Sequence, residues 1–273
     1  MSGEAPPLVW APPAPPVPPR PPVTSGSPAP GGPDGGDPLT SYAWRLRWAA
    51  VFVVLTFVLD ILGGLGVRAV LKLSLGSQAK TLAVGAILVL LYAAQLALVW
   101  TVAHRHGRRL AESVGLRGVS PALVWFGSAL GMAAVVRLLA LVYSAVMISA
   151  GLRLPGWDTD ALRYFPPGPL GSAMLVLIVV VVAPVIEEIV FRGIVLTSLR
   201  ERWGDTSAIL VSSLLFAALH LNLFSFLPIF AVAVVLSRLF ISSRSLWVSI
   251  VCHSAFNGIG VIFLLVLRSR GLA

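Results

Sequence analysis

Apolar stretches long enough to cross a lipid bilayer recur from Ala43 to near residue 267. A spanning helix needs about 20 apolar residues, because each residue adds about 1.5 Å and the hydrocarbon layer is about 30 Å thick. In lipid the backbone must satisfy its own hydrogen bonds, which favours helices. The sequence therefore predicts an all-α, polytopic transmembrane helical bundle of about seven spans, within a range of six to eight. The expected helices cover 46–67, 81–103, 121–150, 170–199, 206–221, 224–241 and 246–267.

The composition agrees with a lipid environment. Only 11% of the 273 residues are charged and 57% are hydrophobic, whereas a soluble domain carries about 25% charged residues. The formal net charge of +9 would suggest nucleic-acid binding in a soluble protein. Here, however, the arginines lie mostly at the ends of apolar runs, where they meet lipid head groups. We therefore expect membrane lipid as a partner and no nucleic acid.

Residues 1–41 have a different composition from the rest of the chain. They hold 14 of the 21 prolines and lack the apolar residues needed for a core. Such a segment is expected to be a disordered, proline-rich cytoplasmic tail with polyproline II character. It does not resemble a signal peptide, because no apolar region precedes Trp48. Residues 42–273 are predicted to form the transmembrane helical domain.

The basic residues predict an orientation. The loop after the second expected span holds the densest cluster, namely Arg105, Arg108, Arg109 and Arg117. Cytoplasmic loops carry an excess of basic residues, so this loop and the N-terminus are expected in the cytoplasm. Ten basic residues then lie near cytoplasmic span ends and seven near outer ends. The dominance of Arg over Lys, with abundant Ala, Gly and Pro, is typical of a GC-rich genome, so a bacterial plasma membrane is expected.

Some ionisable side chains lie inside the expected spans. They are Asp60, Arg137, Glu187, Glu188, Arg192, His220 and His253. A charged group at mid-bilayer costs about 2.5–3.5 kcal/mol on insertion scales, so each requires an explanation. Asp60 and Arg137 stand alone on their helices. We expect a structural role for both, in which they pair with each other or with the glutamates.

The adjacent glutamates lie in the fourth expected span. Glu188 and Arg192 are four residues apart and share one helix face, which favours an ion pair. Glu187 points about 100° away from that face and is left without this partner. Pro184 lies one turn earlier and can bend the helix. A structural salt bridge would explain Glu188 and Arg192, but it would not explain Glu187.

Two histidines can approach the glutamates from other helices. Phe216 and His220 share a face at the end of the fifth expected span, and His253 and Asn257 share a face in the last. With the rise of a helix, His220 and Glu187 lie about 20 Å from the cytoplasmic ends of their spans and His253 about 12 Å. These depths are compatible with one shared site.

At these residues the sequence resembles the CPBP family of intramembrane metalloproteases, which includes CAAX prenyl proteases and bacteriocin-processing (Abi) proteins. The family pattern is EExxxR, then FxxxH, then HxxxN or HxxxD on successive membrane helices. The first element matches Glu187, Glu188 and Arg192, the second Phe216 and His220, and the third His253 and Asn257. The resemblance covers about residues 170–260, the expected protease-like core.

The resemblance implies roles for these residues. Glu187 would be the general base that activates water, and His220 would position the water or polarise the scissile carbonyl. His253 and Asn257 would complete the site, with Asn257 a candidate donor to the oxyanion. Glu188, Arg192 and Phe216 would support the site or bind substrate. Glu187, His220 and His253 could also bind a divalent metal such as zinc, or the same groups could activate water directly.

The sequence therefore predicts an intramembrane endopeptidase of CAAX-protease type. No HExxH metalloprotease helix and no GxGD aspartyl element occurs in the chain. The expected substrate is a membrane-associated protein or peptide, with a prenylated tail as one option. Two alternatives stay open: a non-catalytic scaffold or immunity protein of the same fold, and an ion-coupled transporter, although no internal repeat is evident.

Overall fold

The computed structural model describes Trp44 and residues 46–152 and 164–271, which all belong to one compact unit, Asp37–Ala273. The predicted tail at 1–41 lies outside the described residues. So do three of the basic residues counted near the span ends in the predicted orientation, Arg45 on the cytoplasmic side and Arg153 and Arg163 on the outer side.

The predicted all-α architecture is confirmed. The described helices are α1 (Leu46–Lys72), α2 (Ser77–Arg105), α3 (Leu110–Ser113), α4 (Ala122–Ser149), α6 (Pro169–Val176), α7 (Ala183–Glu188), α8 (Thr197–Leu219), α9 (Phe226–Ser243) and α10 (Leu246–Ser269). Two π-helical segments, η1 (Leu177–Val182) and η2 (Ile189–Leu196), join α6, α7 and α8. Among the described residues, six continuous helical stretches are long and apolar enough to cross a membrane. The chain is therefore an integral, multi-pass membrane protein.

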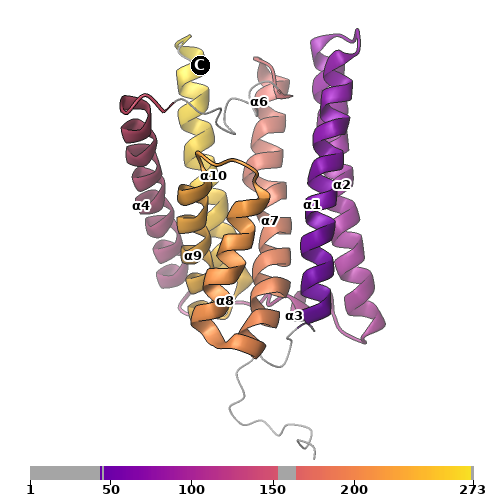
Figure 1. The fold of residues 1–273 in the computed structure, drawn as a ribbon, viewed down its shortest axis with the longest axis vertical. Coiled ribbons are helices and arrows are strands. Elements are labelled where there is room, and N and C mark those ends of the chain that lie inside the picture. The colour runs from indigo at the N-terminus through magenta and orange to yellow at the C-terminus, as the bar shows by residue number, and fades with distance from the viewer. Residues whose placement is uncertain (1–43, 45, 153–163, 272–273) are drawn as a thin grey trace, which may run out of the picture. The chain divides into compact units, whose positions relative to one another are not determined.

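The fourth and fifth expected spans form one helical stretch from Pro169 to Leu219. This stretch is interrupted at Gly204, whose φ of 74° and ψ of 177° are not helical. Glycine adopts such a conformation without the steric penalty of a Cβ atom. The chain changes direction at this turn, so that α8 runs back alongside the preceding helix (Figure 1).

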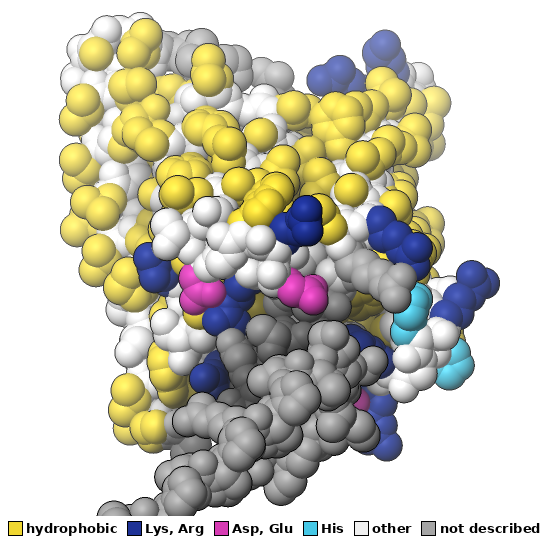
Figure 2. Space-filling view, turned by 60° about the horizontal axis from the view of Figure 1, so that its bottom comes forward, with side chains coloured by type: hydrophobic (Ala, Val, Ile, Leu, Met, Phe, Trp, Pro, Cys, Tyr) yellow, Lys and Arg dark blue, Asp and Glu magenta, His cyan; other side chains and the backbone are white. Residues whose placement is uncertain are grey.

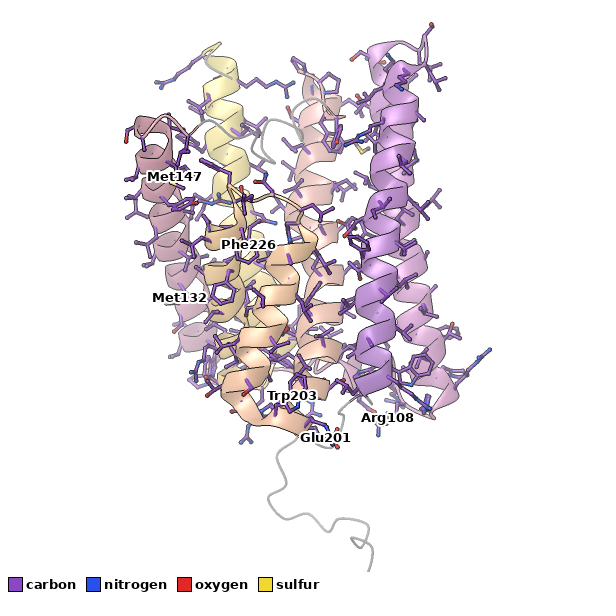
Figure 3. The ribbon with its side chains drawn as sticks, in the orientation of Figure 1. Arg108, Met132, Met147, Glu201, Trp203 and Phe226 are labelled. Atoms are coloured by element: carbon purple, nitrogen blue, oxygen red, sulfur yellow. The ribbon has the colours of Figure 1, made fainter. Side chains whose placement is uncertain are left out.

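The fifth and sixth expected spans are separated by a break at residues 220–225. Helix α8 ends at Leu219 and α9 begins at Phe226, so Pro228 lies in the first turn of α9. A proline in the first turn removes no intrahelical hydrogen bond, which explains why the helix accepts it. Figure 3 places Phe226 well below the upper ends of α4 and α10. The turn between α8 and α9 therefore lies within the depth of the bundle.

The helices are arranged with α4 at one side of the bundle and the α1–α2 hairpin at the other (Figure 1). Helices α9 and α10 pack against α4, whereas α1 packs against η2 and α8. The largest apolar core surrounds the η2 segment, where Ile194 and Leu196 are fully buried together with Phe52 of α1. The segment that carries the glutamates and Arg192 is thus the best-packed part of the molecule.

The basic clusters fall on one end of the bundle. Arg108, Glu201 and Trp203 lie at the lower end in Figure 3, and Figure 2 shows lysine or arginine side chains gathered around that end. The N-terminus of α1, the C-terminus of α2 and the turn between α9 and α10 meet at the same end (Figure 1). This arrangement agrees with the division of basic residues used to predict the orientation. The cytoplasmic assignment of this end stays a prediction.

The buried Arg137 of α4 has a structural partner, but not the one expected. Its Nε and Nη2 atoms donate hydrogen bonds to the carbonyl oxygen of Phe256 in α10, at 2.9 and 2.6 Å. Its guanidinium also lies 3.9 Å from the centre of the Phe256 ring. Asp60 forms no ion pair with it in the described part of the chain, so the expected Asp60–Arg137 pair is wrong. Arg137 instead fastens α4 to α10.

Replacing Gly193 by alanine should destabilise the protein by about 1–3 kcal/mol, because the added methyl group overpacks a full core. A Cβ atom at Gly193 of η2 would lie 2.8 Å from Cβ of Val114 and 3.2 Å from its carbonyl oxygen. The matched control is Gly131→Ala in α4, where a Cβ atom would meet nothing within 4 Å. Unfolding of both variants in detergent micelles measures the difference, and equal stabilities would contradict the close packing.

Candidate active site

The two glutamates lie at the end of α7, between the π-helical segments η1 and η2. A π-helical turn adds a residue to the helical repeat and changes which side chains face a given neighbour, and it is frequent at functional sites. Glu188 is fully buried, whereas the side chain of Glu187 keeps 22% of its surface exposed. The adjacent carboxylates therefore have different environments, as the helical geometry of the sequence predicts.

The predicted ion pair between Glu188 and Arg192 is confirmed. Nη1 of Arg192 donates to Oε1 of Glu188 at 2.8 Å, and both side chains are completely buried. Nη2 of Arg192 donates to the carbonyl oxygen of Ala233 in α9, at 3.0 Å. The guanidinium also lies 4.6 Å from the centre of the Phe216 ring of α8. Arg192 thus joins η2 to two other helices.

His253 of α10 stands between the two carboxylates. Its Nδ1 lies 2.9 Å from Oε1 of Glu188, and its Nε2 lies 3.8 Å from Oε2 of Glu187. Because an ionised carboxylate only accepts hydrogen bonds, the short contact places a proton on Nδ1. In neutral His253, Nε2 then carries a lone pair directed towards Glu187. The buried Glu188 therefore fixes the tautomer of His253.

His220 lies at the C-terminal end of α8 and is exposed to the cavity described below. Its Nδ1 forms a hydrogen bond of 2.7 Å with the carbonyl oxygen of Phe216, one turn earlier. The buried Phe216 ring packs 4.7 Å from the ring of His220 and 5.8 Å from the ring of His253, measured between centroids. The FxxxH spacing therefore serves to hold His220 against a ring that also contacts His253.

Asn257 is one turn after His253, but its side chain is engaged elsewhere. Its Nδ2 donates to the carbonyl oxygen of Val179 in η1, at 2.9 Å. In a π-helical segment the backbone hydrogen bonds are shifted from the α-helical pattern, and the Asn257 side chain provides a donor for one carbonyl of this segment. Asn257 does not belong to the cavity wall. Asn257 thus ties α10 to η1. The role of oxyanion donor that the resemblance implies stays a prediction.

A cavity of about 820 Å³ adjoins Glu187 and His220. Its wall comes from α1, α2, the segment before α6, η1, α7, η2, α8 and the turn after α8. The polar and charged side chains in the wall are Thr56, Asp60, Arg68, Tyr92, Gln95, Tyr164, Glu187, His220 and Asn222. The volume lies in the range of ligand pockets, which is about 300–1,000 Å³.

The sequence reasoning missed the contribution of α1 to this cavity and gave Asp60 a structural role. A signal was present, because Thr56, Asp60, Gly64 and Arg68 recur every four residues in a helix that is otherwise apolar. Residues four apart share one face of a helix. All four line the cavity. A polar stripe on a spanning helix therefore marked the wall of the site.

The residues proposed as metal ligands do not form a metal centre as they are placed. Among the described residues, no group of three or more His, Cys, Asp or Glu side chains is positioned to hold a metal ion. Nδ1 atoms of both histidines are engaged, one with Glu188 and one with the Phe216 carbonyl. Only the Nε2 atoms of the two histidines are therefore left to bind a metal, and as placed the three side chains do not form a three-ligand zinc geometry.

Glu187 and His220 lie in the wall of one cavity, and His253 lies next to Glu187. These features define the class of protein to which the chain belongs. It is an integral membrane protein with a candidate hydrolytic site between its spanning helices. Residues 169–259 match the family described as Type II CAAX prenyl endopeptidase Rce1-like. The matched segment begins with α6 and contains Glu187, His220 and His253. The family resemblance of the motifs is therefore confirmed for this segment.

Two bacterial proteins are similar to the chain. An uncharacterized 24.3 kDa protein of Escherichia coli is 30% identical over 140 residues, which make up 49% of this chain and 64% of that protein. "Putative membrane peptidase YdiL" of Bacillus subtilis (strain 168) is 30% identical over 89 residues, 33% of this chain and 36% of that protein. The chain thus spans less than two thirds of the length of either relative. No solved structure matches the chain.

These matches are thus to a family of prenyl endopeptidases and to a protein named as a membrane peptidase. The family match covers the segment that carries the glutamates and histidines, and it leaves α1, α2 and α4 outside its bounds. Lipid is a partner of the six apolar helices.

Proposed function

We propose that the chain is an intramembrane endopeptidase that hydrolyses a peptide bond with water activated by Glu187. The observation that carries the proposal is the contrast between the two adjacent glutamates. Glu188 is hydrogen-bonded to Arg192 and His253, whereas Glu187 lines the cavity and has no hydrogen bond among the described residues. A carboxylate that is free of structural partners and faces a cavity is available as a general base.

His253 helps to position the water molecule that Glu187 activates. A water molecule that donates one hydrogen to Glu187 and the other to Nε2 of His253 keeps a lone pair free for attack on a carbonyl carbon. The 3.8 Å between Oε2 of Glu187 and Nε2 of His253 is too long for a good direct hydrogen bond. A single water can bridge two acceptors at this separation. Glu187 takes the proton of the water as its oxygen bonds to the carbonyl carbon.

His220 is the group we assign to the carbonyl oxygen of the substrate. It lies in the cavity wall together with Glu187, and only its Nε2 is free to meet a ligand. In its protonated form His220 donates from Nε2 to the oxyanion that develops on the carbonyl oxygen. Asn257 and Phe216 act through their contacts with η1 and with the two histidine rings. We assign them positioning roles.

The substrate class we propose is a membrane-associated protein or peptide, with a prenylated tail among the candidates. The cavity lies at the turn after α8, where Leu221 and Leu223 are 69% and 81% exposed. In a bilayer such side chains contact lipid or an apolar ligand at no desolvation cost. The site is therefore suited to a chain that approaches from the membrane and not from water.

The proposal is tested with purified protein in liposomes that also contain candidate membrane peptides, with and without a prenyl group. We expect cleavage at a defined bond, detected by mass spectrometry of the products. A parallel measurement of solute and proton flux separates the proposal from the transporter alternative. Flux without cleavage, or no cleavage of either the prenylated or the unprenylated peptides, would contradict the protease assignment.

Removing divalent metal ions should leave the cleavage rate unchanged, because the described residues do not form a three-ligand metal group. The protein is dialysed against a strong chelator, its metal content is measured, and cleavage is compared before and after dialysis. Readdition of zinc is the matched control. Loss of cleavage on chelation that one equivalent of zinc restores would contradict this expectation and show that the reaction requires zinc.

A further inference from the structure

Helix α1 presents a polar stripe to the cavity that contains Glu187. Thr56, Asp60, Gly64 and Arg68 are spaced four apart and all line the cavity wall. The helix is otherwise apolar and spans the membrane. Nothing in the three matching motifs, all of which lie in residues 169–259, accounts for this stripe. Its most chemically active member is Asp60.

Asp60 lies near the middle of α1, 14 residues after Leu46 and 12 residues before Lys72. It forms no hydrogen bond or ion pair with any described residue, and Arg137, the expected partner, binds the Phe256 carbonyl instead. A carboxylate at this depth is costly without a partner and marks a functional site by default. Its side chain is exposed, and the surface it exposes is the wall of the cavity.

The cavity brings Asp60 into the neighbourhood of Glu187. Asp60 of α1, Tyr92 of α2 and Glu187 of α7 all line its wall. Two ionised carboxylates that face one low-dielectric cavity repel each other, which favours a state with a single proton on the pair. When one of them must be ionised to act as a base, the other is the natural holder of that proton. A carboxylate pair in these two states can serve as base and acid.

The proposed peptide hydrolysis requires such an acid. Glu187 accepts a proton from water, and the hydroxyl oxygen bonds to the carbonyl carbon. The tetrahedral intermediate then breaks its C–N bond, and the leaving amine must gain a proton as it departs. His220 donates to the carbonyl oxygen in this scheme and is not free for the amine.

We propose that Asp60 is a further catalytic residue, the general acid that protonates the leaving amine. This inference rests on the proposed protease function. The C–N bond breaks with its electron pair on nitrogen, and nitrogen takes the proton of the Asp60 carboxyl group. Glu187, protonated by the attacking water, then returns its proton to the Asp60 carboxylate through cavity water. One water is consumed, and both carboxyl groups regain their starting states.

The test compares two substrates that differ at one atom. The scissile amide of a cleaved peptide is replaced by a thioester, whose thiolate leaves without protonation. In Asp60→Asn we expect amide cleavage to fall about 100-fold or more, the usual contribution of a general acid, and thioester cleavage to fall less than about tenfold. Glu187→Gln should lose both reactions, because both need activated water. Asp60→Glu should restore part of the amide activity.

The controls separate the possible failures. Glu201→Gln removes an exposed carboxylate outside the cavity and should leave both rates unchanged. Retained thioester cleavage shows that Asp60→Asn is folded. Equal losses of amide and thioester cleavage in Asp60→Asn, or no loss of either, would overturn the role of Asp60 while leaving the protease intact. If the wild-type protein cleaves neither substrate, the proposed function fails and the role of Asp60 fails with it.

Discussion

Replacing Glu187 by glutamine should lower the rate of peptide cleavage by about 10²–10⁴-fold, the range that general-base catalysis contributes. The glutamine side chain keeps the size of glutamate and its place in the cavity wall, but it cannot take a proton from water. Because Glu187 forms no hydrogen bond with another described residue and keeps 22% of its side chain exposed, the substitution leaves no buried partner unsatisfied. The loss should therefore appear in kcat, with the substrate KM and the unfolding midpoint close to those of wild type.

The adjacent glutamate provides the contrast that makes this result interpretable. Glu188→Gln removes a buried charge that Arg192 and His253 both contact, so it should lower stability as well as activity. Kinetics and thermal unfolding of the two variants in the same detergent give the comparison. Glu187→Gln that cleaves as fast as wild type, or that is as unstable as Glu188→Gln, would show that the roles of the two glutamates are wrongly assigned.

Replacing Arg192 by methionine should destabilise the protein by about 3–5 kcal/mol, because removal of one partner leaves a buried charge without compensation. Glu188 is 0% exposed, and Arg192 also donates to the Ala233 carbonyl. The substitution therefore removes the hydrogen-bond donor of the Glu188 carboxylate and that of the Ala233 carbonyl at once. Arg238→Met, at an exposed position of α9, is the matched control and should change stability by less than about 0.5 kcal/mol.

The double variant Glu188→Gln, Arg192→Met separates the charge from the packing. It removes both members of the buried pair, so it should be more stable than Arg192→Met alone. Unfolding free energies of the single and double variants in mixed micelles give the coupling. A double variant that is less stable than both single variants would mean that the Glu188–Arg192 pair does not govern the stability of this segment.

The sequence predicted the spanning helices and the Glu188–Arg192 pair because both depend on local periodicity. A polar residue four positions from another on a helix must share its face, whatever surrounds the helix. The same local rule predicted that Glu187 would be separated from this pair, and the structure shows it in the cavity wall. The spacing of Phe216 and His220 was equally local, and the hydrogen bond between them follows from it.

The contacts that the sequence could not predict join different helices. The bond from His253 to Glu188 depends on the rotation of α10 relative to α7, which no spacing encodes. The partner of Arg137 is a backbone carbonyl, which any residue could supply, so Phe256 could not be chosen from residue types. Asn257 reaches the Val179 carbonyl only because the helix around it is π-helical. Tertiary geometry decided each of these cases.

The wall of the cavity is divided between two stretches of the chain. Glu187, Phe216 and His220 lie inside the segment 169–259, whereas Asp60, Arg68 and Tyr92 lie far upstream on the α1–α2 hairpin. The reacting groups and much of the surface that a bound peptide would touch are therefore encoded separately. Substitutions on the hairpin can change which peptides are accepted while the glutamate and the histidines stay as they are. One hydrolytic centre can in this way be combined with different substrate-recognition surfaces.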